Sequence, residues 1–209
     1  MTWMFTSGGT VADLRFIDPE AIRLPDIAHA LAIAPCFCGH TQRPYSVAEH
    51  SLLVVEVMER VLGIRSPSAL LAALMHDAHK AYCGDVSLPM KQLLGLAWRT
   101  EEDRLQWSVL RRFGVAIAFI SHLELIRHAD HVAMATERRD LMPGEGPDGP
   151  SPAGIQPLPD VNLRARDGAA WGDWKQAFID RFVELQQMRQ RHALQKRPFW
   201  GTAFLAEDE

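Results

Sequence analysis

The 209-residue chain is long enough for one folded domain with its own hydrophobic core, and short for two. Its formal net charge of -4 argues against a general nucleic-acid-binding protein, because such proteins carry a basic excess. The three cysteines form no disulfide framework, the first residues lack the pattern of a signal peptide, and no apolar stretch approaches the ~18 residues of a membrane span. We therefore expect a cytoplasmic protein of one domain, residues 1–209, that neither enters a membrane nor binds a specific nucleic acid.

A β-hairpin and a short helix are expected at the beginning of the chain. Residues 1–20 alternate weakly in polarity around a pair of glycines, which is typical of a small hairpin or an irregular lead-in. Pro25 and Asp26 then open a helix that ends at Pro35. Helical spacing turns four of its apolar side chains toward the core: Ile27, Ala30, Leu31 and Ile33.

Capping signals predict the next two helices. Ser46 lies three residues before Glu49 and forms a capping box, which predicts a helix over residues 47–62. A serine–proline pair then starts a helix over residues 67–83, because proline is favoured at the first helical position. This second helix contains the sequence ALLAALMHDAHKAYC.

Two further helices are expected before a loop. Thr100 is followed by acidic residues that complement a helix dipole, so a helix should begin there and end near Gly114. Ser121 and Glu124 form another capping box, which predicts a helix through Leu141.

The last part of the chain combines a long loop with an amphipathic helix. Residues 143–168 are rich in proline, glycine and aspartate and show no periodicity, so they are predicted to form a loop. Residues 169–194 are predicted to be helical. Their apolar stripe is interpreted as core packing: Trp171, Trp174, Phe178, Phe182 and Leu185. The fold expected is an all-α bundle of roughly five to seven helices with a small N-terminal β-hairpin.

Four polar side chains stand beside apolar neighbours on three of the predicted helices: His50, His76, Asp77 and Asp130. Polar groups in such surroundings are costly unless they are bonded. A polar pair at the edge of a buried helix would be the plainer reading of His76 and Asp77. Imidazole and carboxylate donors together suit a divalent cation, which activates water and polarises a phosphoryl group. The pattern therefore indicates a hydrolytic metal centre.

The segments around these residues resemble the HD-domain phosphohydrolase superfamily, and within it the bacterial and phage 5′-deoxynucleotidases and deoxynucleoside triphosphate hydrolases. Five segments carry the resemblance: Tyr45–His50, Leu74–Asp85, Pro89–Lys91, Ala129–Asp130 and Ala135–Asp140. It implies a single HD-domain helical bundle, a nucleotide substrate and a homo-oligomer. It also implies one divalent ion (manganese, cobalt, zinc, iron or magnesium) held by His50, His76, Asp77 and Asp130.

The resemblance also implies roles for residues outside the metal ligands. Asp85 falls on a carboxylate that donates a proton to the leaving oxygen. Lys91, two residues after Pro89, falls on a basic residue placed for phosphate. Phe37 keeps an aromatic position that stacks on a sugar or base. His40 either contacts the substrate or is a loop histidine that caps a backbone carbonyl.

Two departures from the family pattern affect the expected activity. Lys80 stands where relatives carry a glutamate that orients or deprotonates water, and a charged lysine cannot do this. Cys36 stands where they carry an arginine. Either Lys80, Lys91 or Arg43 binds a longer polyphosphate while His79 takes over the water, or Lys80 abolishes turnover and leaves a nucleotide-binding sensor. The motif does not decide between a monophosphatase and a triphosphohydrolase.

Overall fold

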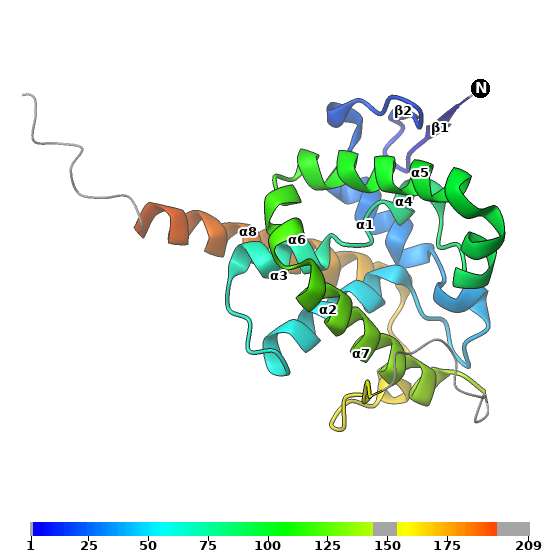
Figure 1. The fold of residues 1–209 in the computed structure, drawn as a ribbon, viewed down its shortest axis with the longest axis vertical. Coiled ribbons are helices and arrows are strands. Elements are labelled where there is room, and N and C mark those ends of the chain that lie inside the picture. The colour runs from blue at the N-terminus through cyan, green and yellow to red at the C-terminus, as the bar shows by residue number, and fades with distance from the viewer. Residues whose placement is uncertain (1, 144–153, 196–209) are drawn as a thin grey trace, which may run out of the picture.

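The computed structural model of the chain describes residues 2–143 and 154–195. These residues form a bundle of helices with a two-stranded antiparallel hairpin at its N-terminal end (Figure 1), as the sequence predicts. The strands are β1 (Trp3–Phe5) and β2 (Val11–Asp13). The helices are α1 (Leu24–Ile33), α2 (Val47–Arg60), α3 (Pro67–Leu74), α4 (Lys80–Cys83), α5 (Leu88–Arg112), α6 (Ala116–Ser121), α7 (Leu123–Leu141) and α8 (Trp171–Gln195).

Two of the sequence predictions, the single domain and the long loop, include residues that the structure does not describe. The single domain predicted over residues 1–209 includes residues 1, 144–153 and 196–209, and residues 144–153 also belong to the loop predicted over 143–168. The described remainder of that loop, 154–168, contains one short 3-10 helix, Leu163–Arg166. Among the described residues, no helix combines the length and apolar character needed to span a membrane.

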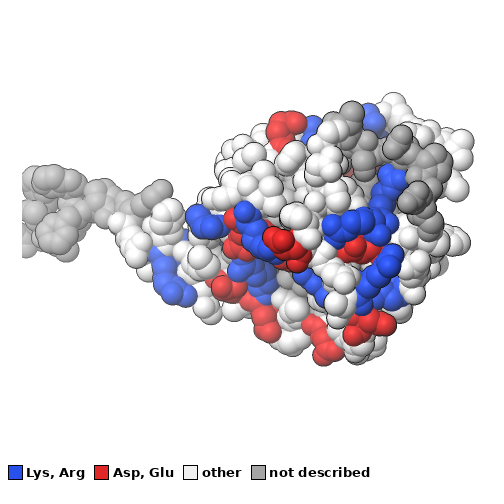
Figure 2. Space-filling model, turned by 90° about the horizontal axis from the view of Figure 1, so that it is seen from below, with Lys and Arg blue, Asp and Glu red and all other residues white. Residues whose placement is uncertain are grey.

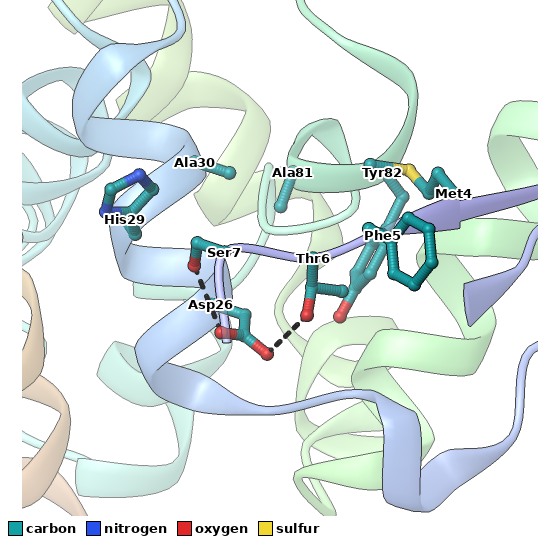
Figure 3. A pocket seen from close by; sticks show the side chains of 9 residues that line it. All are labelled: Met4, Phe5, Thr6, Ser7, Asp26, His29, Ala30, Ala81 and Tyr82. Carbon is teal, nitrogen blue, oxygen red and sulfur yellow. Dashed lines mark hydrogen bonds between the residues drawn. The ribbon is translucent and has the colours of Figure 1, made fainter. Parts of the chain in front are cut away.

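The hairpin is fastened to α1 by side-chain hydrogen bonds (Figure 3). The hydroxyls of Thr6 and Ser7 donate to the two oxygens of the Asp26 carboxylate at 2.9 and 3.0 Å. A Cβ atom on Gly8 would lie 2.6 Å from Asp26 Oδ1, so the turn can approach α1 this closely because it has glycine there. The buried Asp26 thus links the first strand to the first helix.

The second helix lies at the centre of the bundle. It packs against α1, α3, α7 and α8, so every segment that contributes to the candidate site is held against it. Its buried apolar residues include Leu53, Val54, Val57 and Met58, and every residue of α3 except Ser68 is buried. Each such large side chain contributes about 1.5–3 kcal/mol to folding relative to an exposed one.

The predicted helix over residues 67–83 is wrong in one respect that matters for the site. Helix α3 ends at Leu74, residues 75–79 form turns, and α4 begins at Lys80. The Lys80 amide donates to the carbonyl of Asp77, and the His76 carbonyl accepts a hydrogen bond from the Gln106 side chain at 2.9 Å. A contact from α5 therefore replaces the helical hydrogen bond, which the apolar spacing of the sequence does not reveal.

Two predicted helix starts are also corrected. Thr100 lies inside α5, which begins at Leu88 and is interrupted at Gly95, where φ is 62° and ψ is -139°. The capping box expected at Ser121 and Glu124 does not form, because Ser121 is the last residue of α6. Helix α7 begins after His122, which gives no side-chain cap.

The apolar stripes of α1 and α8 are shorter than predicted. Ile27 and Leu31 are buried, whereas Ile33, the last residue of α1, is 52% exposed. In α8 the core residues are Phe178, Phe182 and Leu185, while Trp171 begins the helix and is 52% exposed.

Figure 2 shows charged side chains of both signs side by side on one face of the molecule. Glu56 accepts from Arg60 at 2.5 Å and from Arg166 at 3.0 Å, and Arg181 of α8 pairs with Glu59. Pairs exposed to solvent contribute little stability each, so this face is held mainly by the apolar contacts beneath it.

Candidate metal centre

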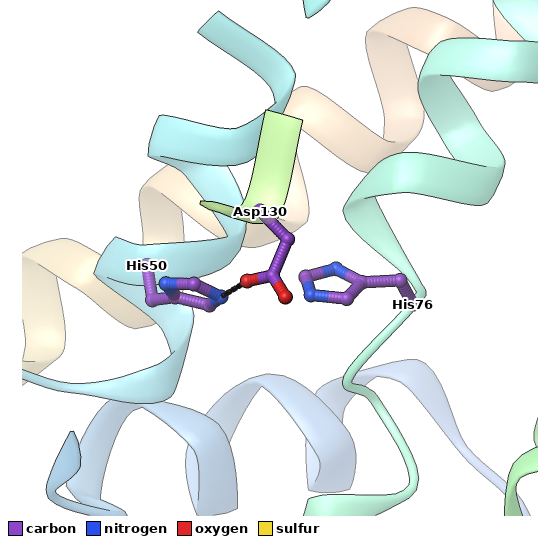
Figure 4. Close-up of side chains that lie close together, drawn as sticks. All are labelled: His50, His76 and Asp130. Carbon is purple, nitrogen blue, oxygen red and sulfur yellow. Dashed lines mark ion pairs between the residues drawn. The ribbon is translucent and has the colours of Figure 1, made fainter. Parts of the chain in front are cut away.

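Three side chains from three separate segments converge on one point (Figure 4). His50 lies in the first turn of α2, His76 in the turn after α3, and Asp130 in the middle of α7. One ligand atom from each lies within 4.8 Å of the others, and both imidazoles are buried. The sequence prediction that these residues meet to form a group able to hold a metal ion is therefore confirmed for three of its four members.

His50 is oriented by a carboxylate behind it. Its Nδ1 lies 2.7 Å from Glu137 Oε1, which also accepts a hydrogen bond from the buried Tyr45 hydroxyl at 2.8 Å. This contact turns Nε2 toward Asp130, whose Oδ1 is 3.1 Å away. Burial alone would lower the pKa of His50, but the carboxylates of Glu137 and Asp130 outweigh it and raise this pKa well above its usual value. A carboxylate behind a histidine ring is the usual arrangement around metal-binding imidazoles.

His76 presents a ring nitrogen that has no hydrogen-bond partner. Its Nδ1 donates to the carbonyl of Ala73 at 2.8 Å, which leaves the lone pair on Nε2. That Nε2 is buried and unpartnered, and it faces the same point as the Asp130 carboxylate. Because an unsatisfied buried polar atom is costly, a cation bound at this nitrogen would remove a penalty. The donor set thus fits a divalent metal ion.

Asp77 lies beside the three-residue group, and its Oδ2 also contacts Lys80. Its Oδ2 is 3.4 Å from His76 Nε2 and 3.6 Å from His50 Nε2, but 2.7 Å from the ammonium of Lys80. Lys80 also lies 2.6 Å from Asp85 Oδ1, so it bridges two acids. Burial disfavours the charge on Lys80, yet the two acids raise its pKa well above the usual value, and the side chain is an ammonium ion.

His79 and Lys91 form a separate cluster around Glu102. His79 is buried, its Nε2 is 3.5 Å from Glu102 Oε1, and Lys91 Nζ is 2.5 Å from the same oxygen. Burial would raise the pKa of Glu102, but the hydrogen bonds from these two residues lower it to about 2. The carboxylate is therefore ionised at neutral pH.

The other residues expected near the substrate lie in the loop before α2 and at the start of α5. Phe37 is half-buried with φ of 53°, in the left-handed region, and His40 is exposed. Arg43 donates two hydrogen bonds to the buried Glu49, at 2.9 and 2.6 Å, which engages its guanidinium inside the protein. Pro89 is exposed in the first turn of α5.

Sequence reasoning gave neither Glu137 nor Tyr45 a role at the centre, although both lie in segments that carry the resemblance. A signal exists for Glu137, because it lies seven residues after Asp130 and so on the same face of α7, two turns along. No comparable signal exists for Tyr45, whose contact joins residues 92 positions apart in the chain.

Two proteins are similar to this chain over much of its length. The uncharacterized protein YfdR of Escherichia coli strain K12 is 30% identical over 174 residues, which are 83% of this chain and 89% of YfdR. An uncharacterized protein of Rhodobacter capsulatus is 35% identical over 142 residues, 66% of this chain and 72% of that protein. No protein-family model matches the sequence.

Proposed function

We propose that this chain, which belongs to one family with Escherichia coli YfdR and the Rhodobacter capsulatus protein, is a metal-dependent phosphohydrolase of deoxynucleotides. The observation that carries the proposal is the convergence of His50, His76 and Asp130, with the buried Nε2 of His76 left without a partner. The substrate class rests on the resemblance of the surrounding segments to HD-domain phosphohydrolases.

The chain supplies the centre and a charge beside it. His50, His76 and Asp130 would hold a divalent cation, with Asp77 at its edge. Such a cation supplies a Lewis acid that activates water and polarises the phosphoryl group. The Lys80 ammonium lies next to this point and would attract a phosphate, since opposite charges in a partly buried site interact strongly. Asp85, 2.6 Å from Lys80, is the carboxyl group to which the resemblance assigns proton donation to the leaving oxygen.

Product analysis tests the proposal and its two versions. The protein is incubated with Mn²⁺ and each deoxynucleoside mono- or triphosphate, and the products are resolved by ion-pair chromatography. A monophosphatase releases phosphate and a nucleoside, whereas a triphosphohydrolase releases tripolyphosphate. His50→Ala should lower product formation by about a hundredfold or more, because it removes a ligand of the centre. His128→Ala, an exposed histidine on α7, is the matched control and should retain activity.

A second candidate function is a nucleotide sensor that does not hydrolyse its ligand. The observation that favours it is the double ion pair of Lys80, because an ammonium ion held by Asp77 and Asp85 cannot deprotonate water. Tight binding of a nucleotide in equilibrium dialysis, with no product from any nucleotide in the assay above, would select the sensor.

A further inference from the structure

One oxygen of the Asp77 carboxylate, Oδ2, lies close both to the proposed metal position and to the Lys80 ammonium. Oδ2 faces the Nε2 atoms of His76 and His50 at 3.4 and 3.6 Å, which is the side on which a shared cation would lie. The same Oδ2 lies 2.7 Å from the Lys80 ammonium, three residues later in the chain. Asp77 is also the one predicted ligand that does not belong to the three-residue group able to hold a metal ion.

We propose that Lys80 is an internal cation that competes with the divalent ion for Asp77 and thereby weakens metal binding at the centre. The proposal rests on the metal centre proposed above and concerns its regulation. Lys80 thus acts through Asp77 as a positioning residue.

Electrostatics makes the two cations mutually exclusive on this oxygen. A divalent ion binds a carboxylate oxygen at roughly 2.0–2.2 Å, so it would lie only a few ångströms from an ammonium on the same atom. Like charges at that separation in a buried site repel strongly. If Asp77 is to bind the ion through Oδ2, Lys80 therefore has to leave that oxygen.

Asp85 provides a second position for the displaced lysine. It lies 2.6 Å from Lys80 Nζ, just after the turn at Gly84, whose φ is 76°. Lys80 can therefore release Asp77 while it stays paired with a carboxylate, so the exchange needs no exposure of the charge to an apolar interior. Lys80, which now bridges both acids, would thus keep its ion pair with Asp85 when Asp77 binds the metal ion.

Metal affinity measured with Mn²⁺ alone tests the proposal. Isothermal titration of the full chain is compared with Lys80→Gln and with the matched control Lys175→Gln, which removes the same charge from α8. Lys80→Gln should bind Mn²⁺ about tenfold to a hundredfold more tightly, the range by which groups next to a metal's ligands change affinity. Lys175→Gln should stay within about twofold of the original protein. Equal or weaker binding by Lys80→Gln would overturn the proposal.

The unaltered protein offers a second readout, which holds even if the Lys80 variant does not fold. The chain has four lysines, so selective ¹³Cε-lysine labelling gives a simple NMR spectrum. Saturation with diamagnetic Zn²⁺ should shift one lysine signal strongly, as that side chain leaves Asp77, and the other three little. A spectrum in which no lysine signal moves at saturation would contradict the exchange.

The same data separate this inference from the proposed function. If the protein and Lys80→Gln bind Mn²⁺ equally, and His50→Ala does not bind it, the metal centre stands and the competition by Lys80 is refuted. If none of the three binds Mn²⁺, the proposed centre fails and the inference fails with it.

Discussion

The Glu137 carboxylate orients the His50 ring so that its Nε2 faces the proposed metal position. It accepts from His50 Nδ1 and from the Tyr45 hydroxyl, and it is 2% exposed. Glu137→Gln should therefore weaken Mn²⁺ binding about tenfold to a hundredfold, because the ring loses the charged partner that orients it and raises its basicity. Titration calorimetry measures this directly. The matched control is Glu124→Gln, which removes an exposed acid from the same helix. An equal loss of Mn²⁺ affinity in both variants would show that the contact of Glu137 with His50 has no specific role.

The three cysteines should differ in reactivity by environment. Burial raises the pKa of the Cys83 thiol to about 11 and that of Cys36 well above the usual value, while Cys38 is exposed. Since only the thiolate reacts, about one Cys83 in a thousand is reactive at pH 8. Timed alkylation with iodoacetamide, followed by peptide mass spectrometry, should modify Cys38 well before the other two. Modification of Cys83 at the rate of Cys38 would contradict the environment assigned to it.

At the scale of residues, the sequence predicts which side chains form the metal centre, but not the hydrogen bonds and ion pairs that they and their neighbours make. His50, His76 and Asp130 were identified because polar donors recur beside apolar stretches, where they need a partner. The bridge from Lys80 to Asp77 and Asp85 escapes such reasoning, because it depends on a tight turn that brings Asp85 back toward α4. The structure shows that Lys80 pairs with Asp77 and Asp85, whereas the sequence left open whether it binds phosphate or abolishes turnover.

At the scale of elements, the hairpin depends on a single acid of α1. Asp26 accepts the hydroxyls of Thr6 and Ser7 and is 6% exposed. Asp26→Ala should lower the free energy of unfolding by about 1–3 kcal/mol, because it removes two hydrogen bonds to a charged group. Urea denaturation followed by circular dichroism provides the measurement. Asp103→Ala, an exposed acid on α5, should change stability by less than about 0.5 kcal/mol, and a similar loss in both would refute the specific role of Asp26.

Capping patterns in the sequence predicted helix ends that depend on neighbouring residues. They failed where a contact with a residue far along the chain sets the end of a helix. The start of α2 was correct because Ser46 accepts from the amide of Glu49, an interaction that lies entirely within four residues. The end of α3 was missed because Gln106, on α5, binds the His76 carbonyl and stabilises a turn. This break has a consequence for the site. It frees His76 and Asp77 from helical geometry and lets both side chains face the centre.

At the scale of the whole molecule, the centre exists because α2 packs against both other segments that carry ligands. Helix α3, which leads into the turn with His76, and helix α7 both pack against α2, whose Leu53, Val54, Val57 and Met58 side chains are buried. The ligand geometry is thus coupled to the stability of the core. Conditions that loosen the bundle should therefore also weaken the metal site.

Acid stability tests the contribution of Glu102, which joins α5 to the segment that carries His79. Its pKa in the folded protein is about 2, below the usual glutamate value of 4.5, because Lys91 and His79 donate to it. A carboxyl group whose pKa is lowered by folding stabilises the protein fully above its unfolded pKa, and the contribution is lost as the pH falls through the folded pKa. The stability that Glu102 contributes should therefore be constant above about pH 5 and decline between about pH 4.5 and pH 2.

Glu102→Gln isolates this contribution. Urea unfolding is measured for the protein and the variant at several values between pH 6 and pH 3, and the difference between their free energies of unfolding is plotted against pH. The variant should be less stable near neutrality, and the difference should shrink as the solution is acidified. Glu101→Gln, whose acid is 61% exposed on the same helix, should show a smaller difference throughout because solvent screens its charge. A difference for Glu102→Gln that stays constant down to pH 3 would mean that the cluster around Glu102 does not hold its carboxylate ionised.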